Sequence, residues 1–156
     1  MIEFMKGDML KESRAHVLVN PVNTYGVMGK GLALYFRQQR PWHYPIYKKM
    51  CNKMDPRNLQ IGFPRLLTPD SLLEQSIICF PTKIDWKYPS NLNWIESGLR
   101  HIVEMRPVWF DKNRHVTMAF PILGAGLGGL DSTQVINLMK MILPDMENTD
   151  VEIWRL

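Results

Sequence analysis

Residues 16–31 read HVLVNPVNTYGVMGKG: a short apolar run ends at two asparagines and passes into a loop with three glycines and one lysine. A helical pattern resumes directly after the loop, so the stretch has the form of a buried strand, a glycine-rich turn and a helix. Glycine lets a backbone approach a ligand closely, and the N–H groups at the start of a helix bind anions. The stretch therefore predicts an α/β fold with a phosphate at the end of the strand, although its glycine spacing matches neither the P-loop nor the dinucleotide fingerprint.

The rest of the chain repeats this alternation of strand and helix. Strands are predicted at residues 2–6, 16–20, around 59–67, 76–80, 115–120 and 151–156. Helices are predicted at residues 31–40, 43–54, 90–105 and 132–143, with prolines following the first three: Pro41, Pro56 and Pro107. This order is typical of a three-layer α/β/α fold whose central sheet, of about six strands, is mixed and largely parallel.

Length and composition limit the possible classes of protein. The 156 residues suit a single domain spanning 1–156, and 46% hydrophobic with 22% charged residues excludes disordered and fibrous classes. No apolar run reaches the length of a membrane span and the N-terminus lacks the layout of a signal peptide, so we expect a cytoplasmic protein with no membrane partner. The net charge of +4 suits a polyanionic partner, but a solvated basic surface explains it equally well.

The residues that commonly bind metals are scattered. Cys51 and Cys79 have no metal-ligand spacing to another cysteine or histidine, and each is expected to behave as a small apolar residue. The four histidines fit no metal pattern either: His16, His43, His101 and His115. The sequence predicts neither a metal site nor a bound cofactor.

The loops at the carboxyl ends of the predicted parallel strands, where ligands of α/β proteins bind, carry unusual sequence. NPVNTYGVMGKG follows the second strand, PTKIDW (81–86) the fourth, and PILGAGLGGLD (121–131) the fifth. The last loop holds four glycines in six residues and leads directly into a helix. Two glycine-rich loops at equivalent positions predict a ligand with two phosphates, held by backbone N–H groups from both sides.

Three of these motifs carry a resemblance to a known family. KGDML (6–10), VNPVNTYGVMGKGLALYF (19–36) and LGAGLGGLD (123–131) together resemble the macrodomain family of ADP-ribose-binding modules and hydrolases, and the resemblance extends over nearly the whole chain. Within that family, GVMGKGLAL, FPTKIDW and NLNWIESGL are most similar to the macrodomains of DarG-type DNA ADP-ribosyl glycohydrolases. A more distant similarity links the chain to the terminal ADP-ribose protein glycohydrolase and to ADP-ribose 1''-phosphate phosphatases.

The resemblance implies an ADP-ribose site. Asp8 would accept a hydrogen bond from the adenine amino group, and the Met9 N–H would contact the same ring. Asn23, with Asn20 nearby, would hold the distal ribose. The remaining implied contacts are the wall around that ribose, Gly29, Lys30 and Gly31, and the diphosphate cradle, Gly124, Ala125, Gly126, Leu127 and Gly128. The residue that stacks on adenine stays open, with Trp154 and Phe120 as candidates.

Lys83 is the predicted catalytic residue, with Asn23 orienting the ribose. The resemblance implies that the Lys83 amine attacks the anomeric carbon C1'' of the distal ribose, which requires the neutral amine; desolvation or a nearby cation such as Lys30 would favour that form. A surface lysine or a phosphate contact is the alternative reading. The aspartate of the terminal glycohydrolase aligns with Gly128 here, and Asp131 is expected to cap a helix, so no catalytic aspartate is carried over.

The leading hypothesis is an ADP-ribosyl glycohydrolase that removes ADP-ribose from a DNA base, with thymidine in single-stranded DNA as the expected target. Trp86 and Lys87 are predicted to contact a base or the DNA. Such an enzyme would reverse a DNA-modifying toxin as an antitoxin or a phage counter-defence factor, and a chain that stops at its sixth strand suggests a freestanding eraser. Three alternatives stay open: a phosphatase acting on ADP-ribose 1''-phosphate, a hydrolase of ADP-ribosyl esters, and a reader that binds ADP-ribose without turnover.

Overall fold

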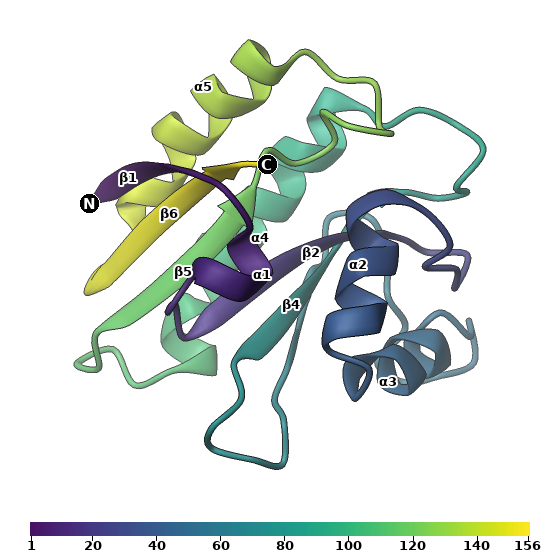
Figure 1. Ribbon diagram of the computed structural model, residues 1–156, viewed down its shortest axis with the longest axis horizontal. Helices are drawn as coiled ribbons and strands as arrows, with labels where there is room; N and C mark the ends of the chain where they lie inside the picture. Colours follow the sequence, from purple (N-terminus) through teal and green to yellow (C-terminus); the bar gives the residue numbers. More distant parts are fainter.

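A six-stranded sheet forms the centre of the computed structural model, which describes residues 1–156 (Figure 1). The strand order is β1-β6-β5-β2-β4-β3, and only β3 runs antiparallel to its neighbour. The strands are β1 (Ile2–Lys6), β2 (Val17–Asn23), β3 (Arg65–Leu67), β4 (Ser76–Lys83), β5 (Val116–Pro121) and β6 (Thr149–Arg155). The prediction of a mixed, largely parallel sheet of about six strands is confirmed.

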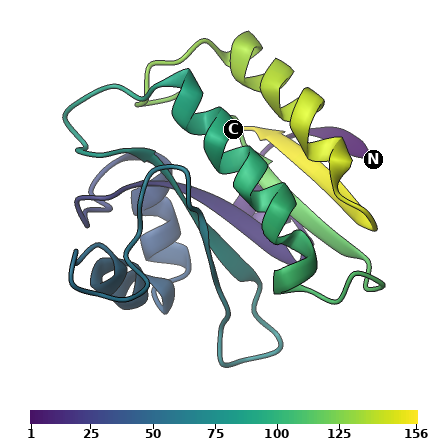
Figure 2. The ribbon, with the colours of Figure 1, turned by 180° about the vertical axis from the view of Figure 1, so that it is seen from behind.

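Helices cover both faces of the sheet. They are α1 (Met9–Glu12), α2 (Gly31–Gln39), α3 (His43–Met50), α4 (Leu92–Trp109), α5 (Ser132–Ile142) and the short 3₁₀ helix η1 (Leu143–Asp145). Figure 1 shows α1, α2 and α3 on the near face, and Figure 2 shows α4 and α5 from behind, on the opposite face. None of these helices is both long and apolar enough to span a bilayer.

Alternation along the strands divides the core in two. In β2, Val17 and Val19 point into the cluster beneath α4 and α5, whereas Leu18 and Val22 point into the cluster beneath α1, α2 and α3. Successive side chains of a strand face opposite sides, so a strand with no polar alternation must be buried on both faces. The continuous apolar runs of the sequence therefore predicted the three layers correctly.

The element boundaries differ from the sequence-based prediction where prolines intervene. β2 continues through Pro21 to Asn23, because it pairs with β5 only at Val17 and Leu18 and then diverges from it. No β5 residue pairs with Pro21, so the lack of an N–H group at this proline costs no hydrogen bond to β5. Helix α4 likewise runs past Pro107 to Trp109, since a proline in the last turn removes only one of the final hydrogen bonds.

Two further boundaries were wrong. The strand predicted around residues 59–67 is reduced to β3 by a turn at Gln60–Phe63, where those two residues form an isolated bridge. Helix α3 ends at Met50 rather than at residue 54, and the one-turn helix α1 was not predicted. Asp8 caps α1 by accepting a hydrogen bond from the Lys11 N–H, a local signal too short for periodicity to reveal.

Candidate functional site

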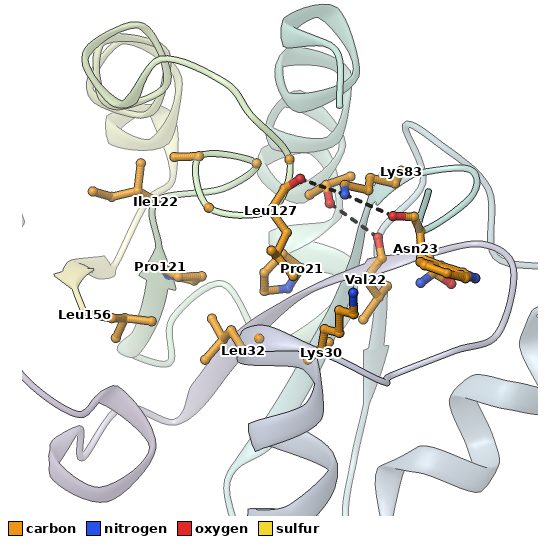
Figure 3. Close-up of a pocket in the computed structure, with 18 of the residues that line it drawn as sticks. Pro21, Val22, Asn23, Lys30, Leu32, Lys83, Pro121, Ile122, Leu127 and Leu156 are labelled. Carbon is orange, nitrogen blue, oxygen red and sulfur yellow. Dashed lines mark hydrogen bonds between the residues drawn. The ribbon is translucent and has the colours of Figure 1, made fainter. Parts of the chain in front are cut away.

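The divergence of β2 from β5 opens a cleft of about 710 Å³ at the carboxyl ends of the strands (Figure 3). Its walls come from the loops after β2, β4 and β5 and from the end of β6. The structure brings together most of the residues predicted from sequence: Asn23, Gly29, Lys30, Gly31, Lys83, Trp86, Gly124, Ala125, Gly126, Leu127 and Gly128. The three loops singled out from sequence thus surround one cavity.

Asp8, Met9 and Lys87 do not line this cleft. One Asp8 carboxylate oxygen accepts a hydrogen bond from the Tyr35 hydroxyl at 2.5 Å, and this bond lowers the pKa of Asp8. The Met9 side chain is fully buried. Asp8 lies just beyond the cleft edge, because the neighbouring Gly7 N–H donates to the carbonyl of Arg155, a lining residue.

Asn20 also lies outside the cleft, in the core beneath α3. Its side chain is fully buried, and its Nδ2 is 3.2 Å from His43 Nε2. His43 Nδ1 contacts the Arg40 carbonyl, which can only accept, so Nε2 carries the lone pair and accepts from Asn20. The expectation that Asn20 takes part in the ligand site is not supported, because a strand-end asparagine faces either the loop or the core and only packing decides which.

Asn23 shapes the loop that follows β2. Its Oδ1 accepts hydrogen bonds from the N–H groups of Tyr25, Gly26 and Val27, at 3.0–3.3 Å, and from the Tyr47 hydroxyl at 2.9 Å. Its Nδ2 donates to the Val27 carbonyl at 2.8 Å. An amide nitrogen has two hydrogens, so one N–H of Asn23 remains for a ligand in the cleft.

Lys83 lies at the end of β4, opposite the glycine-rich loop. Its Nζ donates to the Leu127 carbonyl at 2.8 Å and to the Trp86 carbonyl at 3.4 Å. Burial lowers the pKa of Lys83, since desolvation disfavours the charged ammonium. A bulge between Val22 and Asn23 sets Asn23 opposite Lys83 in the β2–β4 register, so the two predicted catalytic residues are neighbours across strands.

The glycine-rich loop presents free backbone donors. The N–H groups of residues 126–128 donate to no protein acceptor, whereas those of Ala125 and Gly129 close turns within the loop. Across the cleft, the N–H groups of Gly29 and Lys30 are also without a protein acceptor, and they precede the open N-terminus of α2. Two sets of donors facing one cavity can hold an anion such as a diphosphate.

Glycine is needed in this loop for two different reasons. A Cβ at Gly128 would lie 2.3 Å from the Gly124 carbonyl oxygen, a contact that the backbone forbids. A Cβ at Gly126 would meet no protein atom within 4 Å. Gly128 is therefore required by the fold of the loop, and an aspartate at this position would force the loop into another conformation. Gly126 is not required for packing, and its lack of a side chain leaves space in the cleft.

The cleft lining contains no aspartate, glutamate, histidine or cysteine, and its ionisable side chains are Lys30, Lys83 and Arg155. Asp131 caps α5, as predicted, by accepting hydrogen bonds from the N–H groups of Thr133 and Gln134. The structure contains no group of three or more metal-ligating side chains. The hydroxyls of Thr82 and Ser132 have no carboxylate or imidazole base among the lining side chains, so the lysines are the lining side chains that can both attack and carry a proton.

Sequence reasoning missed part of the lining. The additional residues are Pro21, Val22, Val27, Leu32, Ala33, Thr82, Pro121, Ile122, Ser132, Arg155 and Leu156. Trp154, left open as an adenine-stacking residue, also lines the cleft, whereas Phe120 is fully buried in the core beneath α4 and α5. The rule that ligands lie at strand carboxyl ends could have found Arg155, which ends the last strand, and Leu156, which follows it.

Comparisons with known proteins agree with this geometry. A family profile described as "Macro domain" matches residues 19–139. A curated relative named "DNA ADP-ribosyl glycohydrolase", from Thermus aquaticus, is 37% identical over 99% of this chain, and the chain spans only 40% of that relative's length.

Solved structures extend the similarity to the whole fold. The "Macrodomain of Mycobacterium tuberculosis DarG" superposes with a TM-score of 0.88 at 33% identity, covering 100% of this chain and 98% of that one. "Thermosipho africanus DarTG in complex with ADP-ribose" superposes with a TM-score of 0.85 at 36% identity, covering 99% of this chain and 42% of that one. The predicted three-layer macrodomain fold is thereby confirmed.

Proposed function

This chain belongs to the Macro domain family, and from that premise we propose that it is an ADP-ribosyl glycohydrolase, which binds ADP-ribose in the cleft and cleaves the bond between the distal ribose and an attached DNA base. The name "DNA ADP-ribosyl glycohydrolase" of a similar protein supports DNA as the substrate class. The expected target is thymidine in single-stranded DNA. Removing the group would reverse a DNA-modifying toxin, in the role of an antitoxin or of a phage counter-defence factor.

The free N–H groups on both sides of the cleft support the position of the ligand. The diphosphate lies between residues 126–128 and the start of α2, where each side offers donors without a protein acceptor. The distal ribose then lies beside Asn23, whose remaining N–H points to its hydroxyl groups, and beside Lys83. The adenosine extends toward Trp154 and Asp8. A cleft of about 710 Å³ is within the ordinary range for a ligand of this size.

The observation that carries the proposal is the Lys83 amine in a cleft without carboxylates. The neutral amine attacks C1'' of the distal ribose, and the bond from C1'' to the base breaks with its electron pair leaving on the base. The base takes up the proton that the attacking nitrogen loses, and opening of the sugar ring then gives an imine between C1'' and Nζ. Water then hydrolyses the imine, releasing ADP-ribose and regenerating the amine.

The surroundings of Lys83 support this chemistry. Burial lowers its pKa, and the Leu127 carbonyl at 2.8 Å holds the amine on the side of the diphosphate cradle. A mechanism with a lysine and an aspartate together is disfavoured, because the loop has no space for a side chain at Gly128 and Asp131 is occupied as a helix cap. The Ser132 and Thr82 hydroxyls of the lining have no general base beside them there, so the Lys83 amine is the nucleophile that the proposal assigns.

A direct test compares the wild-type protein with Lys83→Ala and Lys83→Arg on three substrates: ADP-ribosylated thymidine oligonucleotide, an ADP-ribosyl-glutamate peptide, and ADP-ribose 1''-phosphate. We expect release of ADP-ribose from the oligonucleotide and a loss of at least about 100-fold in both variants, since neither retains an amine that titrates. Cyanoborohydride added during turnover should reduce the imine and leave ADP-ribose attached to Lys83, detected by mass spectrometry. Lys112→Ala, an exposed lysine in the loop before β5, is the matched control.

The alternatives give different results in the same experiment. Consumption of the peptide or of the 1''-phosphate with no release from DNA would establish an ester hydrolase or a phosphatase. Tight binding of ADP-ribose in calorimetry without consumption of any substrate would establish a reader. Full activity of Lys83→Ala on DNA would exclude the lysine nucleophile.

A further inference from the structure

The loop after β4 exposes large apolar side chains beside the cleft. Ile84, Trp86 and Tyr88 are 58%, 43% and 66% exposed, and none of them belongs to either core cluster. Trp86 is part of the cleft lining, whereas Tyr88 lies two residues farther along the loop, outside the cleft. Aromatic side chains left in water beside a binding site are a common mark of a contact surface.

Two lysines gather on the Trp86 ring. The Lys30 Nζ lies 5.8 Å from the ring centroid and the Lys87 Nζ 5.6 Å from it. Lys30 comes from the start of α2 and Lys87 from the same loop as the tryptophan, so two separate segments converge on one exposed ring. An exposed aromatic ring with two ammonium groups near it matches the needs of a nucleotide, because a base stacks on the ring and a phosphate pairs with an ammonium group.

Asp85, the acidic residue of this loop, has its carboxylate bound to the backbone of the same loop. One Asp85 carboxylate oxygen accepts a hydrogen bond from the Lys87 N–H at 3.0 Å, and the Asp85 carbonyl accepts from the Tyr88 N–H at 3.2 Å. Asp85 therefore forms the turn that carries Trp86 and holds its carboxylate against the backbone.

Trp86 also lies beside the proposed reaction centre. Its backbone carbonyl accepts a hydrogen bond from the Lys83 Nζ, and the residue lines the same cleft as that amine. The diphosphate cradle occupies the other side of Lys83, through the Leu127 carbonyl. With the diphosphate on the Leu127 side of the amine, the proposed function directs a group bonded to C1'' to the Trp86 side.

We propose that Trp86 and Tyr88 form a stacking platform for a nucleotide that flanks the modified one in single-stranded DNA, with Lys87 pairing with its phosphate. The proposal rests on the proposed function for the direction in which the strand runs. Exposed cation–π contacts change an equilibrium constant by only about threefold, whereas a stacked base contributes about tenfold or more. A base therefore displaces an ammonium from the ring, and the displaced ammonium is free to meet a phosphate.

The platform can be tested without catalysis, by fluorescence anisotropy with a labelled, unmodified ten-nucleotide oligothymidylate at low salt. We expect Trp86→Ala to weaken binding about tenfold and the Lys87→Ala/Tyr88→Ala double variant to weaken it at least as much. Lys87→Ala alone should reduce the slope of log affinity against log salt by about 0.7, the value for one phosphate contact with a single strand. Phe63→Ala and Lys112→Ala, which alter an exposed aromatic and a lysine outside the cleft, are matched controls expected to bind as the wild type does.

Two results would overturn the platform. The first is binding of the oligonucleotide by Trp86→Ala and by the double variant as tight as that by the wild type. The second is binding of duplex as tight as that of the single strand, since paired bases cannot stack on a side chain. Thermal unfolding of each variant separates a lost contact from a lost fold.

A second measurement separates the platform from the proposed function. It compares KM for an ADP-ribosylated thymidine mononucleotide with KM for the same nucleotide inside an oligonucleotide. The wild type should favour the oligonucleotide, and the double variant should lose that preference. If the anisotropy result holds but neither substrate is consumed, the proposed function fails and the platform stands. If both are consumed and the preference survives in the double variant, the platform fails and the proposed function stands.

Discussion

Among single residues, the glycines of the cleft loop differ in whether the surrounding backbone leaves space for a side chain. Gly128 has no space for a Cβ, whereas Gly126 has open space on the cleft side. The two glycines are two positions apart in the sequence GAGLGG and look equivalent there. Only the fold of the loop separates their roles.

The two glycines should respond differently to alanine. Gly128→Ala is expected to destabilise the protein by about 1–3 kcal/mol, because the added methyl group meets the Gly124 backbone. Gly126→Ala should leave the free energy of unfolding within about 0.5 kcal/mol of the wild type but weaken ADP-ribose binding, since the methyl group enters the ligand's space. Urea unfolding and calorimetry check the two parts, and tight ADP-ribose binding by Gly126→Ala would contradict the position given to the diphosphate.

The lowered pKa of Lys83 predicts how the rate depends on pH. In the proposed mechanism only the neutral amine attacks C1'', so the single-turnover rate should rise about tenfold per pH unit below that pKa and level off above it. Because burial lowers the pKa, the plateau should begin below the ordinary lysine value of about 10.4. A rate that does not fall when the pH is lowered to about 5, the lower end of the pKa range of buried lysines, would contradict a lysine that must lose its proton.

At the scale of elements, helix α4 approaches β4 closely enough to fix the strand that carries Lys83. A Cβ on Gly98 would lie 2.3 Å from the Phe80 ring, so the helix rests on the ring through a glycine. Phe80 precedes Lys83 by three residues in the same strand. The spacing between helix and strand thus bears on the position of the amine.

Enlarging Gly98 should therefore move the strand. Gly98→Ala is expected to cost about 1–3 kcal/mol of stability through overpacking, even though alanine is the better helix former. Ser97→Ala, at the neighbouring exposed position, is the control and should be neutral or slightly stabilising. Chemical denaturation of both variants gives the comparison, and a stabilised Gly98→Ala would show that the helix can shift freely.

The elements were largely predictable from the sequence, but their ends were not. Apolar periodicity located all six strands and the four longer helices, because burial on both faces leaves a continuous apolar run. The end of α4 was predicted too early because of Pro107. The free-energy cost of a proline depends on the hydrogen bond that it removes. In a strand this is set by the neighbouring strand, and in a helix by the number of turns that follow.

At the scale of the whole molecule, Arg106 joins three segments at the end of the sheet opposite the cleft. Its side chain is nearly fully buried, and its Nε donates to Thr149 Oγ1 at 2.7 Å. Its two terminal nitrogens donate to the carbonyl groups of Phe110, Asp111, Arg114 and Asn148. The guanidinium thus ties the end of α4, the loop that follows it and the start of β6.

Removal of Arg106 should affect the whole fold. Arg106→Leu removes the guanidinium from its buried position and deprives the Thr149 hydroxyl and the Phe110 and Arg114 carbonyls of that donor, so we expect a loss of about 3 kcal/mol in the free energy of unfolding. Arg100→Leu, at an exposed arginine paired with Glu96 on the same helix, should change it by about 0.5 kcal/mol or less. Equal effects of the two substitutions would contradict the proposed role of Arg106 as a clamp.

Patterns along the chain were enough to predict the α/β/α layers and the three loops that meet at one edge of the sheet. Parallel strands all present their carboxyl ends at the same edge, so unusual loops after three of them had to converge. The tertiary structure decided what the sequence left equivalent. The Asn20 side chain lies in the core, and the Asn23 side chain binds the loop after β2. Asp131 caps α5, and Arg155 from the last strand lines the cleft. These choices depend on packing between segments distant in the chain, which no local pattern of residues encodes.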